Sequence, residues 1–445
     1  MIAVINRRFQ MAATNSSTPD AQKSPPERFS VFSALRHRNF RLLWLGQIVS
    51  VTGSQMQLFA VNWHVYLLTK SAFAVGLVGL FRGGPIILCS LVGGVVADAV
   101  DRKRLMIVTQ SVMLVSATCL MAVTLAGLSH VWPIYLLTAI ASAASAFDTP
   151  ARQSLMPSLV PAHDFANAVS LGVVVFYIAM IGGPALAGFV LAGQGPAFVY
   201  GINAASFLAV IAALVAMHVS GRVVAQSELA SRVSLAALKE GLRFVRQTPI
   251  IVQTMTLDFA ATFFASATAL LPIFAIKILN VGAHGYGLLG AAPAVGAVIT
   301  GLVMARIGTF RRQGKLVIWS VAIFGLATIA FGLSRVFWLS LLMLGLTGAA
   351  DTVSTVLRQT IRQLATPDHL RGRMTSVNMV FFMGGPQLGE VEAGAVASLI
   401  GAPLSVVTGG IGCVVSALIA LLKAKSLLNY EGESHNDGAL AAKRN

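Results

Sequence analysis

Four charged side chains lie deep inside long apolar stretches of this chain: Arg82, Asp258, Glu390 and Glu392. An ionisable side chain is costly in an apolar environment, so such a residue by default indicates a function. Because poorly solvated carboxyl groups bind protons readily, the three acids are candidates for proton coupling. Arg82 is expected to be the only buried basic residue and to balance one of the acids. A static buried ion pair is the alternative for each of them.

Two further acids lie near the ends of apolar stretches, and each is followed by an arginine. Asp148 precedes Arg152, and Asp351 precedes Arg358. We predict that these residues form ion pairs, which either gate a conformational change or stabilise the helix ends.

The apolar stretch near residues 40–68 carries many polar side chains. Such side chains either line a cavity or bond to neighbouring helices. Because they are numerous here, cavity lining is favoured for the following residues: Gln47, Gln55, Gln57, Asn62 and Trp63.

The composition excludes an ordinary water-soluble protein. Of the 445 residues, 56% are hydrophobic and only 11% are charged, and the mean hydropathy is +0.78. Soluble domains are about 25% charged, so the sequence predicts an integral membrane protein. The 3 cysteines and 8 histidines show no metal-ligand spacing, and no phosphate-binding Gly-x-x-x-x-Gly-Lys loop occurs. No metal and no cofactor are therefore expected.

Long apolar segments define the predicted architecture, because a helix needs about 20 apolar residues to cross a membrane. The sequence predicts an all-α fold with twelve transmembrane helices. They are expected near residues 40–68, 74–98, 105–127, 132–156, 166–192, 196–218, 249–278, 285–306, 315–333, 336–360, 374–400 and 402–423.

The basic residues predict the orientation of these helices. Of the 32 Lys and Arg residues, only Lys70, Lys277 and Arg335 fall in loops on one side, and nearly all others fall on the opposite side. Cytoplasmic loops carry the excess of basic residues, so both termini are expected in the cytoplasm. The net charge of +16 is thus a topology signal, and no nucleic-acid partner is expected.

The loop after the sixth predicted helix divides the chain into two halves. Leu235, Leu238, Leu242 and Val245 recur in it at helical spacing, which predicts an amphipathic helix on the membrane surface. This helix is either a plain linker or a regulatory latch. The predicted organisation is a disordered cytoplasmic tail (1–38), a six-helix bundle (39–218), the linker (219–248), a second six-helix bundle (249–423) and a cytoplasmic tail (424–445).

Short matches between the halves indicate an internal repeat. Their order along the chain is the same in both halves: Gly76-Leu77-Val78-Gly79 with Gly287-Leu288-Leu289-Gly290, Asp148 with Asp351, Pro161 with Pro367, and Gly182-Gly183-Pro184 with Gly384-Gly385-Pro386. Six helices per half give both copies the same orientation. Two parallel halves of this kind place a substrate site between them, near the middle of the membrane.

A short charged hinge separates the second and third predicted helices. Its small residues permit close approach of a neighbouring helix, and its acidic and basic residues meet at the water boundary. The residues of interest are Gly94, Asp98, Asp101, Arg102, Lys103 and Arg104.

The fifth predicted helix contains Gly172, Gly183, Pro184 and Gly188. A proline inside a helix removes a backbone hydrogen bond and permits a bend. The alternative is ordinary packing of small residues against a neighbouring helix.

The charged hinge resembles the signature loop of the major facilitator superfamily, Gly-x-Leu-Ala-Asp-Arg-x-Gly-Arg-Lys. Residues 29–44 and the acidic Asp101 are similar to the transmembrane secretion effector branch, the third drug:proton antiporter family. This branch includes enterobactin-exporter-like and macrolide-efflux-like proteins. The resemblance implies that Asp98 clamps the two halves on the cytoplasmic side. It also implies that the glycine-proline motif of the fifth helix, similar to Gly-Pro-x-x-Gly-Gly, marks an exporter.

The chain departs from this family at several positions. Ala99 and Ala187 stand where the two motifs have arginine and glycine, and Ala305 replaces Asp98 in the second half. Residues 132–147 lack the basic residue that many relatives use in proton coupling. The candidates for proton coupling are therefore the buried residues named above: Asp258, Glu390, Glu392 and Arg82.

The leading functional hypothesis is a monomeric, multi-pass transporter of the cell inner membrane, without enzymatic activity. It would export a small amphipathic organic molecule, either a drug-like compound or a siderophore, by proton antiport. A proton-coupled importer or a facilitator on the same fold is the alternative. An integral-membrane enzyme is remote, because no clustered nucleophile, base or metal-ligand set occurs in the sequence.

Overall fold

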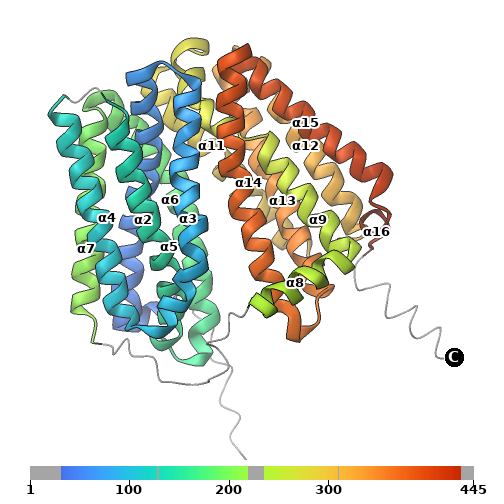
Figure 1. The fold of residues 1–445 in the computed structure, drawn as a ribbon, viewed down its shortest axis with the longest axis horizontal. Helices are drawn as coiled ribbons and strands as arrows, with labels where there is room; N and C mark the ends of the chain where they lie inside the picture. Colours follow the sequence, from blue (N-terminus) through green and yellow to red (C-terminus); the bar gives the residue numbers. More distant parts are fainter. Residues whose placement is uncertain (1–31, 128–129, 219–234, 309, 432–445) are drawn as a thin grey trace, which may run out of the picture.

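A computed structural model describes residues 32–127, 130–218, 235–308 and 310–431 of the chain. The described residues form helices joined by short connections, and the long helices gather into two bundles (Figure 1). This arrangement confirms the predicted all-α fold of two six-helix halves.

The helices of the first bundle, among the described residues, are α2 (Arg38–Thr69), α3 (Ala72–Ala99), α4 (Arg102–Leu125), α5 (Trp132–Leu155), α6 (Phe165–Gly193) and α7 (Pro196–Ala216). Those of the second are α9 (Pro249–Phe264) with its continuation, α11 (Gly282–Ile307), α12 (Gln313–Leu333), α13 (Phe337–Leu364), α14 (Arg371–Ile400) and α15 (Ala402–Lys423). Helix α8 (Leu235–Gln247) precedes the second bundle, and the short α16 (Lys425–Leu428) follows it.

Nine of the described helices are long and apolar enough to cross a membrane. Helices α2, α5 and α14 match their length but carry charged and amide side chains. Several of these side chains are buried inside the bundles, where other helices supply their partners. Polar residues facing a bundle interior are compatible with a membrane-spanning position.

The predicted membrane segment near residues 249–278 is confirmed as a candidate span, Pro249–Ile278, but it is not one continuous α-helix. Helix α9 ends at Phe264, and the chain continues through η4 (Ala267–Leu270), α10 (Leu271–Ile273) and the π-helical turn η5 (Phe274–Ile278). Ala265 has φ −102° and ψ 33°, outside the helical region. We call this interruption the α9 break.

Neighbouring helices hold the α9 break in place. A Cβ atom added at Gly389 of α14 would lie 2.3 Å from the Phe263 carbonyl oxygen, so only glycine fits there. Ser266 donates a hydrogen bond to the carbonyl oxygen of Pro386 in α14 at 3.2 Å. The break is therefore a packed feature that joins α9 to the proline-containing part of α14.

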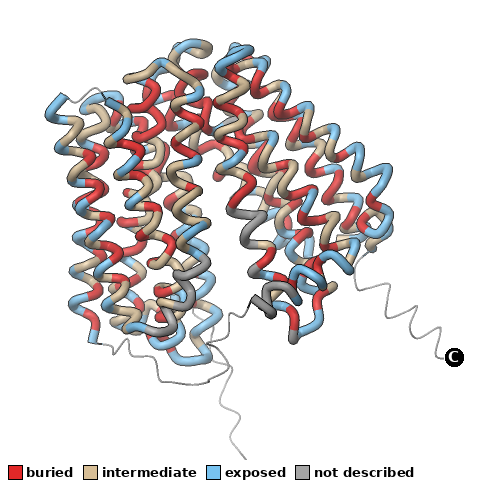
Figure 2. Tube along the Cα trace, viewed as in Figure 1, coloured by how far each residue is buried: buried red, intermediate tan, exposed pale blue. Residues whose placement is uncertain are grey.

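The bundles share one hydrophobic core at the end of the molecule away from α8, which we call the far end. This core includes Trp63 and Val75 from the first bundle and Phe274, Tyr286 and Leu289 from the second. Figure 2 shows the buried residues continuing from one bundle to the other at this end.

Two glycine crossings bring the bundles into contact there. Gly76 of α3 lies against Gly394 of α14, and Gly188 of α6 lies against Gly287 of α11. A Cβ atom added at Gly287 would lie 2.5 Å from the Pro184 carbonyl oxygen. Helix backbones can approach this closely only where both surfaces lack side chains.

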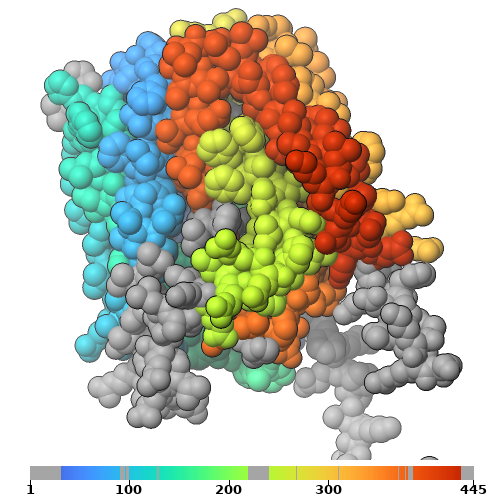
Figure 3. Space-filling model, turned by 45° about the vertical axis from the view of Figure 1, so that its right-hand side comes forward, coloured from blue at the N-terminus to red at the C-terminus, as the bar shows by residue number. Residues whose placement is uncertain are grey.

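The opposite end, which we call the linker end, has separate cores. One contains Phe40, Met106 and Leu214 of the first bundle, and another contains Val317 and Ile361 of the second. The ribbons of the two bundles diverge toward this end in Figure 1. Figure 3 shows α14 beside the first bundle in its upper part, with α8 and α9 covering the lower part of the second bundle.

Helix α8, where the sequence predicts an amphipathic helix, packs against the second bundle at the linker end. Val245 is buried with Ile251, Met255 and Met374, and Arg373 of α14 pairs with Glu240 at 2.5 Å. The residues of α8 therefore face both the protein and the surroundings, as an amphipathic surface helix requires.

The packed structure extends past both predicted tail boundaries. Ser33–Arg36 forms a 3₁₀ helix, and Ala34 within it is fully buried. Leu427 of α16 is also fully buried. Residues 1–31 and 432–445 of the predicted tails, with residues 219–234 of the predicted linker, lie outside the described part of the chain.

We expect Gly287→Val to separate the far ends of the two bundles, because a side chain cannot fit between α11 and α6. Spin labels at Gly127 and Arg335, both exposed at the far end, would report a longer distance by double electron–electron resonance. Gly301→Val is the matched control on α11, since no atom lies within 4 Å of its added Cβ. An unchanged distance in Gly287→Val would contradict the proposed role of this crossing.

Candidate functional site

An ion pair between Arg82 of α3 and Glu390 of α14 crosses the interface between the bundles. Arg82 Nη2 lies 2.9 Å from Glu390 Oε1, and the side chains are 18% and 8% exposed. No other ion pair joins the two bundles within the described ranges. Arg82 thus pairs with Glu390 and not with Asp258 or Glu392.

Glycines of α3 make room for this ion pair. A Cβ atom added at Gly79 would lie 2.7 Å from both Cβ and Oε2 of Glu390, and one added at Gly83 would meet the Gln387 side chain. The Oε2 atom is buried without a hydrogen-bond partner. The Glu390 side chain therefore packs against the glycine backbone of α3, and Arg82 supplies its hydrogen bond and its countercharge.

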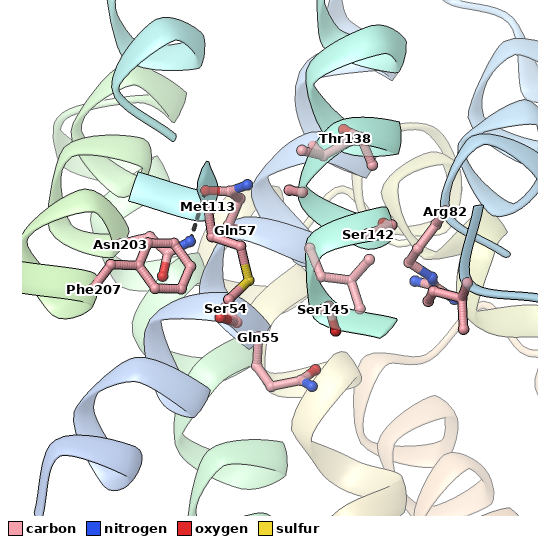
Figure 4. A pocket seen from close by; sticks show the side chains of 14 residues that line it. Ser54, Gln55, Gln57, Arg82, Met113, Thr138, Ser142, Ser145, Asn203 and Phe207 are labelled. Atoms are coloured by element: carbon pink, nitrogen blue, oxygen red, sulfur yellow. Dashed lines mark hydrogen bonds between the residues drawn. The ribbon is translucent and has the colours of Figure 1, made fainter. Parts of the chain in front are cut away.

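Arg82 also lines a polar cavity inside the first bundle (Figure 4). The cavity has a volume of about 220 Å³, which is enough for several water molecules. Its other polar lining residues come from α2, α5 and α7: Ser54, Gln55, Gln57, Thr138, Ser142, Ser145 and Asn203. Hydroxyl and amide groups therefore lie beside Arg82 on this side, together with apolar side chains such as Leu58 and Met113.

The second bundle contains a denser charge network around Asp258 of α9. Arg358 of α13 lies 2.8 Å from Asp258 Oδ1 and 3.7 Å from Asp351 Oδ1. Arg362 lies 3.5 Å from Asp258 Oδ2. Arg358 is only 1% exposed, whereas the Asp351 side chain is 49% exposed and lines a small cavity of the second bundle.

The expectation that Arg82 is the only buried basic residue is therefore wrong, since Arg358 and Arg362 are buried as well. Helix α13 continues to Leu364, past the predicted end at residue 360, and this extension carries Arg362 inside. The spacing of Asp351, Arg358 and Arg362, which places them near one another along a helix, was the available signal.

The predicted ion pair between Asp148 and Arg152 is also wrong. Asp148 accepts hydrogen bonds from Thr109 and Gln110 of α4, both at 3.0 Å. Arg152 donates to the side-chain oxygen of Gln47 on α2. The two side chains leave α5 toward different neighbours, although they are one helical turn apart. The Asp351–Arg358 pair, in contrast, is present.

The polar residues of α2 have different surroundings. Gln55 and Gln57 line the polar cavity, and Asn203 donates to Gln57 at 2.7 Å. Asn62 and Trp63 are buried and do not line the polar cavity, so cavity lining stays a prediction for these two. Trp63 instead contacts Tyr286 of the other bundle, with the ring centroids 5.0 Å apart.

The described side chains of the charged hinge bind helix ends. Asp101 accepts a hydrogen bond from the Arg104 backbone and caps α4. Arg102 donates to the Ser154 carbonyl oxygen and Lys103 to that of Met217. Both acceptors lie where a helix leaves carbonyl groups without internal partners. The side chains of the hinge residues Gly94 and Asp98 lie outside the described part.

The motif residues of the fifth transmembrane helix, α6, lie at three different contacts. Gly183 meets Gln55 of α2, and Gly188 and Pro184 meet Gly287 of α11. Gly172 lines a larger cavity between α2, α5 and α6. The motif therefore shapes both an interface between bundles and a cavity wall.

The chain matches the family model described as transmembrane secretion effector over residues 29–437. Enterobactin exporter EntS of Salmonella choleraesuis (strain SC-B67) is 25% identical over 394 residues, covering 88% of this chain and 94% of that protein. Enterobactin exporter EntS of Escherichia coli O9:H4 (strain HS) is 24% identical, and the match again covers 88% of this chain and 94% of that protein.

Solved transporter structures share the fold at low sequence identity. The nucleoside transporter NupG has a TM-score of 0.65 at 15% identity, covering 88% of this chain and 99% of that one. The peptide transporter POT in complex with sulfate has a TM-score of 0.70 at 11% identity, covering 88% and 95%.

We expect Asp258→Asn to destabilise the protein by about 3–5 kcal/mol, because it leaves two buried arginines without their shared carboxylate. Denaturant unfolding of the purified protein in detergent would measure this loss. Asp368→Asn removes a partner of Arg371 whose side chain is 88% exposed, and it should change stability by less than about 1 kcal/mol. Equal effects of the two substitutions would contradict a structural role for the Asp258 network.

Proposed function

Because this chain belongs to the transmembrane secretion effector family, we propose that it exports a small organic molecule across the cell inner membrane in exchange for protons. The linker end faces the cytoplasm, and the far end faces outward. The basic residues of the loops support this orientation. Transport proceeds by alternating opening of the two ends around a site between and within the bundles.

The ion pair between Arg82 and Glu390 is the observation that carries the proposal. It joins α3 to α14 beside the glycine crossing of Gly76 and Gly394. Opening of the far end must separate these helices, and this would leave two charges apart in a poorly solvated place. The Coulomb attraction of such a pair is much larger than in water. The ion pair therefore holds the empty, deprotonated protein with its far end closed.

Protonation of Glu390 would remove its negative charge and release this lock. Binding of a substrate from the linker end would also allow the ion pair to separate, because the free energy of binding offsets the cost of separating the two charges. The far end can then open when the protein carries a proton or a substrate, but not when it carries neither. We propose that this dependence couples export of the substrate to entry of the proton.

The polar cavity beside Arg82 supports a proton path to the ion pair. Its hydroxyl and amide groups come from three helices, and its volume of about 220 Å³ admits water. The Arg82–Glu390 pair also lies between the two bundles, which alternating access must separate. The Asp258 network lacks such a position, because it lies within one bundle.

The relatives' printed function, export of enterobactin, favours a siderophore or a similar amphipathic molecule as substrate. A proton-coupled importer or a facilitator on the same fold remains the competing function. The direction of enterobactin flux in proteoliposomes separates them. An exporter moves the probe toward the side from which protons come, and an importer moves it with them.

We expect Glu390→Gln to abolish accumulation of enterobactin driven by a pH gradient, while exchange of labelled for unlabelled enterobactin continues. The neutral amide cannot form the charged lock, so the protein changes conformation without a proton. Both activities can be measured in the same proteoliposomes. Glu392→Gln is the matched control on α14, because Glu392 makes no ion pair among the described residues. Gradient-driven accumulation equal to wild type in Glu390→Gln would refute this coupling role.

We expect Asp98→Asn to abolish transport without preventing insertion, if Asp98 clamps the linker end during the outward-open state. The carboxylate is needed for the clamp, whereas insertion depends on the basic residues of the hinge. Asp101→Asn is the control, because asparagine also caps a helix well. Normal export by a well-inserted Asp98→Asn protein would rule out the clamp.

A further inference from the structure

We propose that Arg152 and Gln47 bind the anionic group, a carboxylate or phenolate, of an aromatic substrate in a cavity of the first bundle. This proposal rests on the proposed transport function and names the chemical class of its substrate. It follows from a difference between the two halves of the molecule.

The internal repeat relates this position to the charge network of the second bundle. Gln47 precedes Gly76 by the same number of residues as Asp258 precedes Gly287, its repeat partner. Likewise, Arg152 precedes Pro161 by the same number of residues as Arg358 precedes Pro367. The contact of Gln47 with Arg152 therefore corresponds to the contact of Asp258 with Arg358.

The two contacts differ in charge. In the second bundle a carboxylate neutralises the arginine, and Asp351 adds a second one at 3.7 Å. In the first bundle the partner is a neutral amide, and the register that pairs Arg152 with Arg358 places the uncharged Ser145 where Asp351 stands. Asp148 is bonded to α4. In the stretches that the structure describes, no carboxylate oxygen lies within 4.0 Å of the Arg152 guanidinium. Arg152 thus retains an uncompensated positive charge.

The amide of Gln47 offers a second donor at the same place. Gln47 is only 6% exposed, and its oxygen accepts from Arg152. Its nitrogen, Nε2, is buried without a hydrogen-bond partner. An unsatisfied buried donor is costly, and an anionic oxygen would satisfy it together with the guanidinium. Charge-assisted hydrogen bonds of this kind are among the strongest in proteins.

Both residues face a cavity that suits an aromatic molecule. Its volume is about 590 Å³, and it lies between α2, α5 and α6, within the range of sites for small organic ligands. The aromatic lining residues are Phe40, Trp44, Phe165, Phe176 and Tyr177. Phe40 and Phe165 stand near the starts of their helices at the linker end, which we assign to the cytoplasm. The site can therefore receive a substrate from that side.

Binding of 2-naphthoate and 2-naphthamide to the purified full-length protein tests the proposal, because the probes share one ring system and differ in charge. Quenching of Trp44 fluorescence reports binding, and Trp44→Phe identifies its contribution among the 5 tryptophans. We expect wild-type protein to prefer the naphthoate by about tenfold or more, as charge-assisted hydrogen bonds predict. Equal affinity for the two probes would overturn the proposal.

Gln47→Asp gives the first bundle the carboxylate that its counterpart has. The new aspartate neutralises Arg152, so we expect the preference for naphthoate to disappear while naphthamide still binds. Arg152→Gln should have the same effect by removing the charge itself. Gln47→Asn, which keeps a neutral amide, is the matched control and should retain the preference. A preference that survives in Gln47→Asp or Arg152→Gln would overturn the proposal.

These measurements require neither a membrane nor a gradient, so they are independent of proton coupling. Glu390→Gln protein should bind naphthoate as wild type does. A loss of gradient-driven export with an intact naphthoate preference would refute only the transport mechanism. Export of enterobactin by a protein without this preference would refute only the Arg152 site.

Discussion

A guanidinium group removed from water needs a partner that supplies both hydrogen bonds and negative charge, and this need organises the interior of the molecule. Arg358 finds its carboxylate within its own bundle, so that contact holds the bundle together. Arg82 finds its carboxylate on the other bundle, so the same chemistry links the two bundles. Arg152 finds only an amide, and we propose that it is available to a ligand. The location of the partner decides the role of each arginine.

The backbone geometry makes these partnerships possible. Glycines at the α3–α14 crossing remove the side chains that would hold Glu390 away from Arg82. The corresponding crossing of α6 and α11 places Tyr286 where its hydroxyl donates to the Phe59 carbonyl oxygen at 3.0 Å. The shared core at the far end and the separate cores at the linker end then favour opening on one side. A repeated helix arrangement thus supports contacts that differ in chemistry.

The helices could be predicted closely from the sequence, because their apolar length is set by the membrane: the segment expected at 132–156 is observed as Trp132–Leu155. The α9 break could not be, since the glycines that accommodate it lie more than a hundred residues away. Sequence proximity also misassigned Asp148, whose direction from α5 is decided by hydroxyl and amide donors on α4. The acid–arginine partnerships across helices depend on packing, which single residues do not reveal.

The α9 break has a mechanical consequence for the ion pair between the bundles. The carbonyl oxygen of Phe263 rests on Gly389, the residue next to Glu390, and Ser266 bonds to Pro386 one turn earlier in α14. If α9 bends at this point during the proposed transport, the turn of α14 that presents the carboxylate moves with it.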